Sequence, residues 1–377
     1  MIEEPLLACL TDVFSSDGQV GIRDVLALPT SGDPRAFVPV AHRRSAARAL
    51  WRQYAGGGAR RRAETTALAS LVTIGFAGRV PRWRVSFPDP PSESAFHPWL
   101  RTVLHQPYYV GIVLIGPRRA NRKPVVMLTD RQGALIAVAK LGYNRVTRPL
   151  VRHEANALRD VAAALEGRAH VPVLLASDRL EHTEAMLMNP LPKINSGKRV
   201  SRETLVAVVR GIASSAVGRR TDLSTVIEHP RMRPIVDAAN RVSARTSQAP
   251  VGAAHGDLHA GNLGVAEDGR PVIWDWERWT HGVPVGFDLL HHDLQSWVSG
   301  GSDPQEAARR LLATAPEILA PLGVPTHLAA DIACDYLVRL AARYVDDAQD
   351  QAGSKLGTVE NWLFPAVLDH QQNEERT

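Results

Sequence analysis

Three short apolar runs in the middle of the chain constrain its fold most. They occupy residues 110–115, 125–129 and 134–141, and a basic loop and the turn residues 131–133 separate them. Apolar runs of this length, bounded by glycine and polar residues, are typical of β-strands, and short connections favour antiparallel pairing. The sequence therefore predicts an antiparallel meander of three strands.

The segment after the meander adds one helix and two strands. Residues 148–165 have helical periodicity, and apolar runs at 171–176 and 185–188 precede the turn sequence Asn189-Pro-Leu-Pro. Three strands, a helix and two strands form a compact α+β unit, which we expect to span residues 106–191.

The chain becomes mainly helical beyond residue 201. A short strand at 251–254 and a hairpin around Asp268-Gly269, formed by 262–266 and 271–274, interrupt the helices. The predicted helices cover residues 202–215, 232–245, 303–314 and 326–347. An early sheet followed by helices is typical of the α+β class, and we expect residues 192–377 to form a helical part.

The first 105 residues differ from the rest of the chain. Arginine-rich helical patterns at 42–54 and 63–75 are broken by three glycines at 56–58 and end at a proline cluster, so we predict a helical N-terminal extension of residues 1–105. Its arginines favour either a solvated or interdomain helix face or an anionic partner. The sequence leaves its role and the oligomeric state open.

Composition excludes several classes of protein. With 377 residues and 45% apolar residues, the chain is too hydrophobic to remain disordered. Cys9 and Cys334 are too few for a disulfide framework or a thiolate zinc site. The most apolar stretch, residues 108–115, is too short to cross a bilayer, so we expect a cytoplasmic protein with no membrane partner.

Charge is distributed unevenly along the chain. The net charge is +5, but residues 255–377 hold 8 Lys and Arg against 19 Asp and Glu, a balance of −11. This acidic second part disfavours nucleic acid as a partner and favours a cationic small molecule.

Two linked motifs carry the chemistry. The sequence HGDLHAGN occupies residues 255–262, and VIWDWE occupies residues 272–277 after the predicted hairpin. Asp257, Asn262 and Asp275 would then converge, and carboxylate and amide oxygens are ligands that Mg²⁺ prefers. The alternative is a loop before a hairpin in which Asp and Asn only form turns.

The paired motifs resemble those of the aminoglycoside phosphotransferase and choline kinase family, relatives of the protein kinases. The resemblance implies a two-lobed protein-kinase-like fold, with an antiparallel-sheet N-lobe and a mainly helical C-lobe that holds the acceptor. It also implies ATP or GTP with Mg²⁺ as cofactors. Asp257 is then the catalytic residue, Asn262 and Asp275 bind the metal, and His255, grouped with the catalytic residues, ties the loop to neighbouring backbone.

The same resemblance assigns nucleotide-binding residues upstream. Lys140 would hold the phosphates and Glu154 would hold the lysine. Gly116 opens a basic loop, 116–123, that has no G-x-G-x-x-G pattern, so this loop is either a phosphate contact or a solvated hairpin. The connector that would contact the nucleotide base contains Met186, Met188 and Asn189.

Further residues near the motifs have assigned or alternative roles. Asp288 resembles the family's structural aspartate, which braces the catalytic loop, and Glu277 alternates to the same side of the chain as Asp275. His291, His292 and Asp293 favour a helical segment over a metal cluster, because adjacent histidines point in different directions.

Three functions are consistent with this sequence. The first is a kinase of a small-molecule hydroxyl, with an aminoglycoside, amino sugar or other sugar as the acceptor. The second is a kinase of a non-sugar metabolite or another antibiotic. The third is a regulatory protein that binds a partner through its basic N-terminal region, which predicts damage to Lys140, Asp257, Asn262 or Asp275, and all four are intact. A protein kinase is disfavoured because no A-P-E signature follows Asp275.

Overall fold

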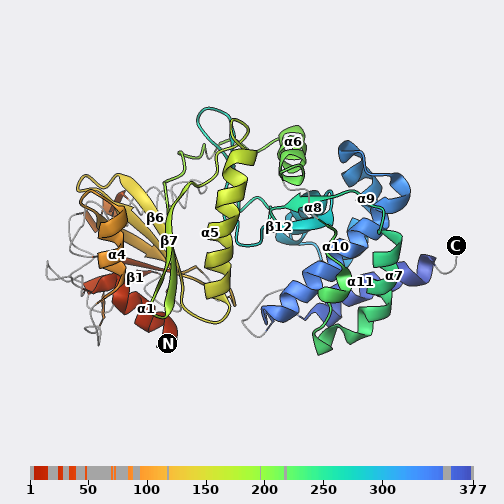
Figure 1. Ribbon diagram of the computed structural model, residues 1–377, viewed down its shortest axis with the longest axis horizontal. Coiled ribbons are helices and arrows are strands. Elements are labelled where there is room, and N and C mark those ends of the chain that lie inside the picture. The colour runs from red at the N-terminus through yellow and green to blue at the C-terminus, as the bar shows by residue number, and fades with distance from the viewer. Residues whose placement is uncertain are drawn as a thin grey trace. The chain divides into compact units, whose positions relative to one another are not determined.

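The computed structural model describes most of the chain in two compact units (Figure 1). One, here the sheet unit, contains residues 1–156 and 172–196; the other, the helical unit, contains residues 157–171 and 197–377. The described residues are 4–15, 24–28, 34–39, 47–48, 69–70, 72–73, 84–87, 94–116, 119–195, 197–215, 219–350 and 358–374.

The sheet unit is built on one antiparallel sheet with the strand order β3-β1-β2-β4-β5-β6-β8-β7. Its strands are β1 Asp24–Leu28, β2 Ala36–Pro39, β3 Arg84–Ser86, β4 Tyr109–Leu114, β5 Val125–Thr129, β6 Leu135–Gly142, β7 Leu174–Leu180 and β8 Thr183–Met188. The predicted meander is confirmed as β4-β5-β6, and the two later strands as β7 and β8. Gly133 has φ +80° in the β5–β6 turn, a conformation that favours glycine.

The described strands before residue 105 pair into the same sheet as the meander. Strand β2 pairs with β4, and β1 lies between β2 and β3. Helices α1 (Glu4–Phe14) and α4 (Phe96–Val103) share one apolar core with this sheet, in which Phe14 and Phe96 are buried. Non-local strand pairing thus joins the described N-terminal strands to the meander, and the division at residue 105 stays a prediction.

The two arginine-rich patterns at 42–54 and 63–75 lie almost entirely outside the described residues. Helix α5 (Thr147–Ala164) follows the meander, as predicted. Thr147 begins it by accepting hydrogen bonds from the backbone N–H groups of Tyr143 and Asn144.

The helical unit packs its helices around α10. This helix contacts α7, α8, α9 and α11, and most of its side chains are buried. The helices are α6 Arg202–Ala213, α7 Val236–Arg245, α8 Phe287–Ser299, α9 Pro304–Leu319, α10 Thr326–Asp346 and α11 Val359–Glu374, with short 3₁₀ turns η3 Leu223–Thr225, η4 Pro230–Ile235 and η5 Ala320–Leu322. The predicted helices are confirmed, but α7 starts four residues late because Pro234 lies in the preceding 3₁₀ turn.

Two small antiparallel pairs complete the helical unit. Strand β10 (Leu263–Val265) pairs with β11 (Pro271–Ile273), which confirms the predicted hairpin, and Gly269 has φ +86° in its turn. Strand β9 (Val251–Ala254) pairs with β12 (Thr280–Pro284), which the sequence did not indicate. These pairs position the HGDLHAGN segment, because it begins directly after β9 and ends where β10 starts.

Both cysteines are buried free thiols, and burial raises the pKa of Cys9 to about 12. Among the described residues, no helix combines the length and the apolar character needed to span a membrane.

Candidate functional site

Residues 255–262, here the catalytic loop, are shaped by a glycine that no other residue can replace without strain. Gly256 has φ +80°, and a Cβ at this position would lie 2.1 Å from the backbone oxygen of Arg278. A side chain would therefore collide with the segment that follows β11. The loop can run this close to that segment only because residue 256 is glycine.

His255 ties the catalytic loop to the same segment. Its ring is buried against Trp276, its Nε2 lies 3.0 Å from the carbonyl oxygen of Trp274, and its Nδ1 accepts from the backbone N–H of Asp257. Burial lowers the pKa of His255 to about 4, although nearby Asp257 opposes the shift. The neutral ring therefore donates from Nε2 to Trp274. The expected contact with neighbouring backbone is present, while a catalytic role for His255 stays a prediction.

Asp288, near the start of α8, accepts hydrogen bonds from the backbone at the start of the catalytic loop. Its carboxylate accepts from the backbone N–H groups of His255 at 2.8 Å and Gly256 at 3.0 Å, as the resemblance implies. Burial raises the pKa of Asp288 to about 7, against the effect of these two hydrogen bonds. The prediction of a structural brace is confirmed in its geometry.

Asp257 is surrounded by hydrogen-bond donors and cationic side chains. Its Oδ1 lies 3.1 Å from Nε2 of His291 and 3.6 Å from Nη2 of Arg343. Its Oδ2 accepts from Nδ2 of Asn262 at 3.2 Å and lies 3.7 Å from Nε2 of His259.

These surroundings keep the Asp257 carboxylate ionised. Burial by itself would raise its pKa, but hydrogen bonding to His259 and His291 and the charge of Arg343 outweigh burial and hold the pKa well below its ordinary value. The side chain remains 28% exposed, so a molecule from solvent can reach it.

Asn262 and Asp275 are the residues predicted to bind a metal, and this role stays a prediction. The side-chain N–H₂ of Asn262 donates to Asp257, which leaves its amide oxygen as a possible ligand, and its backbone oxygen accepts from the N–H of Trp274. Asp275 has φ +69°, a conformation that is uncommon outside glycine and clusters at functional sites. The backbone bond between residues 262 and 274 therefore brings the two motifs together.

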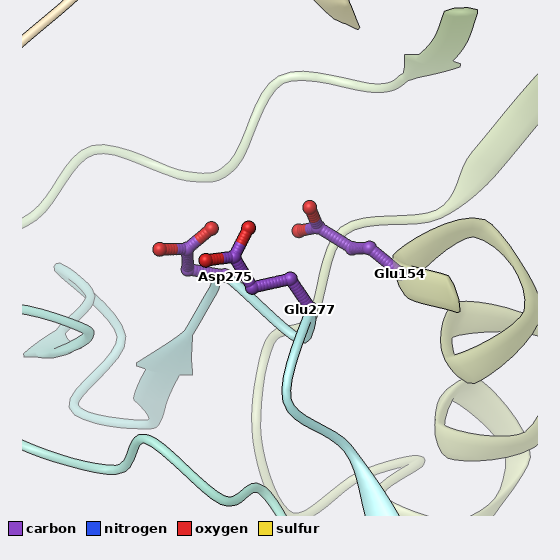
Figure 2. Close-up of side chains that lie close together, drawn as sticks. All are labelled: Glu154, Asp275 and Glu277. Carbon is purple, nitrogen blue, oxygen red and sulfur yellow. The ribbon is translucent and has the colours of Figure 1, made fainter. Parts of the chain in front are cut away.

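Glu277 joins Asp275 on the same side of the chain. The two carboxylates point the same way in Figure 2, and oxygens of the two groups lie within 4.8 Å of each other. Glu277 is buried, with 2% exposure. A pair of carboxylates at this separation suits a divalent cation that prefers oxygen ligands.

In the sheet unit, Lys140 and Glu154 form a buried ion pair. Nζ of Lys140, on β6, donates to both carboxylate oxygens of Glu154, on α5, at 2.6 and 2.8 Å. Their side chains are 9% and 0% exposed. The predicted contact between the two residues is confirmed, while their role toward a nucleotide stays a prediction.

One basic side chain of the loop at 116–123 donates hydrogen bonds to nearby backbone. Gly116 has φ +65°, and its N–H donates to the backbone oxygen of Arg35. Arg122 donates to the backbone oxygens of Ile115 and Pro34, so this guanidinium stabilises the loop. Residues 117–118 lie outside the described residues.

The predicted connector residues lie at the end of β8. Met186 and Met188 are buried in the sheet, at 0% and 5% exposure. Asn189 accepts from the N–H of Val173 through its side chain and donates its own N–H to the Val173 carbonyl. Asn189 thus closes the end of the β7–β8 pair, and a nucleotide contact stays a prediction for all three residues.

Sequence reasoning missed the side chains that contact Asp257 from other helices. His291 lies in α8, which confirms the helical interpretation of residues 291–293, but its ring points to Asp257. Arg343 lies on α10 and also donates to the backbone oxygen of Gly256, whereas Tyr336 of α10 contacts His291. The apolar neighbours of His291 at helical spacing, Phe287 and Leu294, are a signal of its burial, but no sequence signal pairs it with Asp257.

Comparisons with known proteins gave structural similarity only. No protein-family model matches the chain, and no curated protein matches it. The structure of LicA in complex with AMP is 13% identical, with a TM-score of 0.48 over 73% of this chain and 96% of that one. Choline kinase LicA from Streptococcus pneumoniae is 12% identical, with a TM-score of 0.41 over 66% of this chain and 89% of that one.

A third similar structure is aminoglycoside phosphotransferase APH(3'')-Id from Streptomyces rimosus, in complex with ADP and streptomycin. It is 14% identical, with a TM-score of 0.37 over 56% of this chain and 90% of that one.

Proposed function

We propose that the protein is a phosphotransferase that moves the γ-phosphate of ATP or GTP to a hydroxyl group of a small molecule. The observation that carries this proposal is the catalytic loop, in which a hydrogen-bonded, partly exposed Asp257 adjoins Asn262. Phosphoryl transfer passes through a loose transition state, so an enzyme mainly positions the hydroxyl and neutralises phosphate charge. Asp257 is suited to the first task.

The proposed role of Asp257 is to orient the acceptor hydroxyl and accept its proton. A carboxylate with a pKa well below its ordinary value is a weak base. It is adequate here, because the proton leaves the hydroxyl late in a loose transition state. Orientation is then the larger part of its contribution.

Oxygen donors near the loop fit a magnesium ion. The amide oxygen of Asn262 and the carboxylates of Asp275 and Glu277 are the chemical groups that Mg²⁺ binds. When bound, the ion supplies positive charge to phosphate oxygens. We assign Asn262 and Asp275 as its ligands, with Glu277 beside them.

Lys140 is assigned to the phosphates of the nucleotide. The ion pair with Glu154 fixes the lysine in one position and keeps it charged while buried. A lysine ammonium has three donors, so Lys140 can hold Glu154 and still donate to phosphate oxygens.

The acceptor we favour is an aminoglycoside, an amino sugar or another sugar. The balance of −11 over residues 255–377 supports a cationic acceptor. Other hydroxyl-bearing metabolites and antibiotics form the second group to test.

The direct experiment incubates the purified protein with ATP or GTP and Mg²⁺ and a panel of aminoglycosides, amino sugars, neutral sugars and nucleoside antibiotics. Mass spectrometry then detects the mass increase of one phosphate on the acceptor. We expect Asp257→Asn to reduce turnover by roughly 10²–10⁴-fold while nucleotide binding, measured by calorimetry, is kept. Equal loss of turnover and nucleotide binding would contradict the role of Asp257.

A matched control is Asp268→Asn, an exposed aspartate in the β10–β11 turn of the same unit. It should retain turnover.

Asp275→Asn should raise the Mg²⁺ concentration needed for nucleotide binding, and an unchanged metal dependence would exclude Asp275 as a ligand. If the wild-type protein binds no nucleotide at all, the phosphotransferase proposal is wrong.

A further inference from the structure

We propose that His291 is a positioning residue for Asp257: it holds Oδ1 of the carboxylate, so that Oδ2 faces the acceptor hydroxyl, and Tyr336 fixes the orientation of His291. This inference rests on the proposed function, because it assigns a role within the same site. Neither residue belongs to the HGDLHAGN or VIWDWE motif.

The geometry of His291 is that of a relay between two other side chains. Its side chain is 0% exposed, and its Nε2 lies 3.1 Å from Oδ1 of Asp257. Its Nδ1 lies 2.9 Å from the hydroxyl of Tyr336, which is also buried. Of the cationic and imidazole nitrogens near Asp257, Nε2 of His291 is closer than those of Arg343 and His259.

The proton positions in this relay follow from which groups can donate. The Asp257 carboxylate only accepts, so Nε2 of His291 must carry the hydrogen. Burial lowers the pKa of His291, against the effect of Asp257, which favours the neutral ring. Its Nδ1 then has a lone pair and accepts from the hydroxyl of Tyr336. Its buried Nε2 makes no aligned hydrogen bond within the described part of the chain and lies 3.1 Å from Oδ1 of Asp257, so this N–H is the donor that the proposal assigns to Oδ1.

The relay leaves a specific part of the carboxylate for the acceptor. Oδ1 lies 3.1 Å from Nε2 of His291 on α8 and 3.6 Å from Nη2 of Arg343 on α10, whereas Oδ2 accepts a hydrogen bond from Asn262 and lies 3.7 Å from Nε2 of His259. A carboxylate oxygen has two lone pairs, so Oδ2 can accept the hydrogen of a hydroxyl as well. Without His291 the carboxylate could rotate about χ2, which is a broad torsion for Asp.

The surroundings of His291 offer no substitute for this contact. The groups that face it are Asp257 and His259 from the catalytic loop and Tyr336 and Arg343 from α10. Nη1 of Arg343 donates to the backbone oxygen of Gly256, and its Nη2 lies 3.6 Å from Oδ1. Loss of the imidazole should therefore remove the shorter of the two contacts of Oδ1 and keep the longer contact to Arg343.

The kinetic test compares His291→Leu with His291→Gln. The leucine removes the donor, and we expect kcat to fall roughly 10–100-fold, the cost of misplacing a reacting group, with KM for nucleotide and acceptor nearly unchanged. Glutamine offers an N–H₂ near the position of Nε2, so His291→Gln should recover most of kcat. Tyr336→Phe should lower kcat less than His291→Leu does.

The matched control is His292→Leu, the same change at the next residue of α8, where the side chain is 24% exposed. It should keep kcat. Equal kcat for His291→Leu and wild type would overturn the proposal, as would equal losses in His291→Leu and His291→Gln. Thermal unfolding checks that each variant is folded. If His291→Leu does not fold, the fall in kcat of Tyr336→Phe tests the proposal instead.

A second measurement does not depend on turnover. Nuclear magnetic resonance of protein labelled with ¹⁵N in histidine reports which ring nitrogen of His291 carries hydrogen, with His291→Gln to assign the signal. We expect hydrogen on Nε2 and a shift of that signal in Asp257→Asn. Hydrogen on Nδ1 would overturn the relay even if phosphate transfer is found, whereas hydrogen on Nε2 without any transfer would uphold the relay and reject the proposed function.

Discussion

Lys140 of the sheet unit and Asp257 of the helical unit are both held by hydrogen bonds, but in different ways. Lys140 donates to the carboxylate of Glu154 on the next helix along the chain. Asp257 is contacted by Asn262 of its own loop and by side chains from α8 and α10. The ion pair of Lys140 joins elements that are adjacent in sequence, whereas the contacts of Asp257 depend on how helices distant in sequence pack.

This difference predicts where each site is sensitive to change. Removal of one member of the buried ion pair between Lys140 and Glu154 breaks two short charge-assisted hydrogen bonds, which costs stability directly. Removal of one partner of Asp257 leaves other donors in place. The free energy of unfolding should therefore change little, while the orientation of the Asp257 carboxylate and kcat should change more. The following predictions test the comparison from the largest expected effect to the smallest.

Glu154→Gln should have the largest effect on stability. The change removes the negative charge from a buried ion pair, so the free energy of unfolding should fall by about 3–5 kcal/mol. The double variant Lys140→Met with Glu154→Leu should recover most of this loss, because it removes both buried charges. Urea unfolding measures all three proteins.

The control for this pair is Asp160→Asn, an exposed residue on the same helix α5. It should change the free energy of unfolding by less than about 0.5 kcal/mol. If Glu154→Gln were no more destabilising than Asp160→Asn, the local pair would not carry the stability assigned to it here.

Asp288→Asn should change how stability depends on pH. Burial raises the pKa of Asp288 to about 7, so between its ordinary value and about pH 7 the folded protein keeps a proton that the unfolded chain has released. Asp288 therefore contributes stability below its unfolded pKa, and that contribution is lost as pH rises through about 7. Each unit of pKa difference corresponds to about 1.4 kcal/mol.

The measured quantity is the free energy of unfolding of wild type minus that of Asp288→Asn, followed from about pH 4 to about pH 8. It should decrease with rising pH and become constant above about pH 7. His255, whose lowered pKa acts in the opposite direction, is present in both proteins and cancels in the difference. A difference that stays constant over this range would show that burial does not raise the pKa of Asp288.

Gly256→Ala should have an intermediate effect. The left-handed conformation disfavours alanine by about 1–2 kcal/mol, and the added Cβ would also collide with the backbone of Arg278. We expect a loss of roughly 2–3 kcal/mol in the free energy of unfolding and loss of phosphate transfer. Gly269→Ala is the control, because Gly269 also has a positive φ but has no atom within 4 Å of an added Cβ. Equal losses for the two variants would mean that the close approach to Arg278 is unimportant.

Glu360→Gln should have the smallest effect. Glu360 accepts two hydrogen bonds from Arg231, but the two side chains are 39% and 30% exposed. Exposed ion pairs contribute less than about 1 kcal/mol and weaken with salt. Unfolding at low and high ionic strength should show a small loss that shrinks as salt is added, and a loss as large as that of Glu154→Gln would remove the distinction between buried and exposed pairs.

The strands of the meander could be predicted from sequence because each pairs with its neighbour along the chain. Strands β1 to β3 could not, since Asp24 pairs with Ser86 and Ala36 with Leu114, and short apolar runs do not specify partners that far away. Strand β12 was missed for a related reason, because its partner β9 lies before the catalytic loop.

The residues of the candidate site also divide into those that sequence could predict and those that it could not. Asp257, Asn262 and Asp275 fall in two adjacent motifs, and one hairpin brings them together, so spacing alone was informative. The contacts of His291 and Arg343 with Asp257 depend on the packing of α8 and α10, and this packing has no pattern within any single segment.

The register of β6 limits which insertions and deletions the chain can tolerate. Lys140 lies opposite Val125 on one side and Met186 on the other, and successive side chains of a strand point to opposite faces. One residue gained or lost between the turn and Lys140 would turn the lysine away from Glu154, whereas a change of two would restore its direction. Chains descended from this one are therefore expected to vary more readily at turn residues 131–132 than at Gly133, and to change the length of β6 before Lys140 only in even steps.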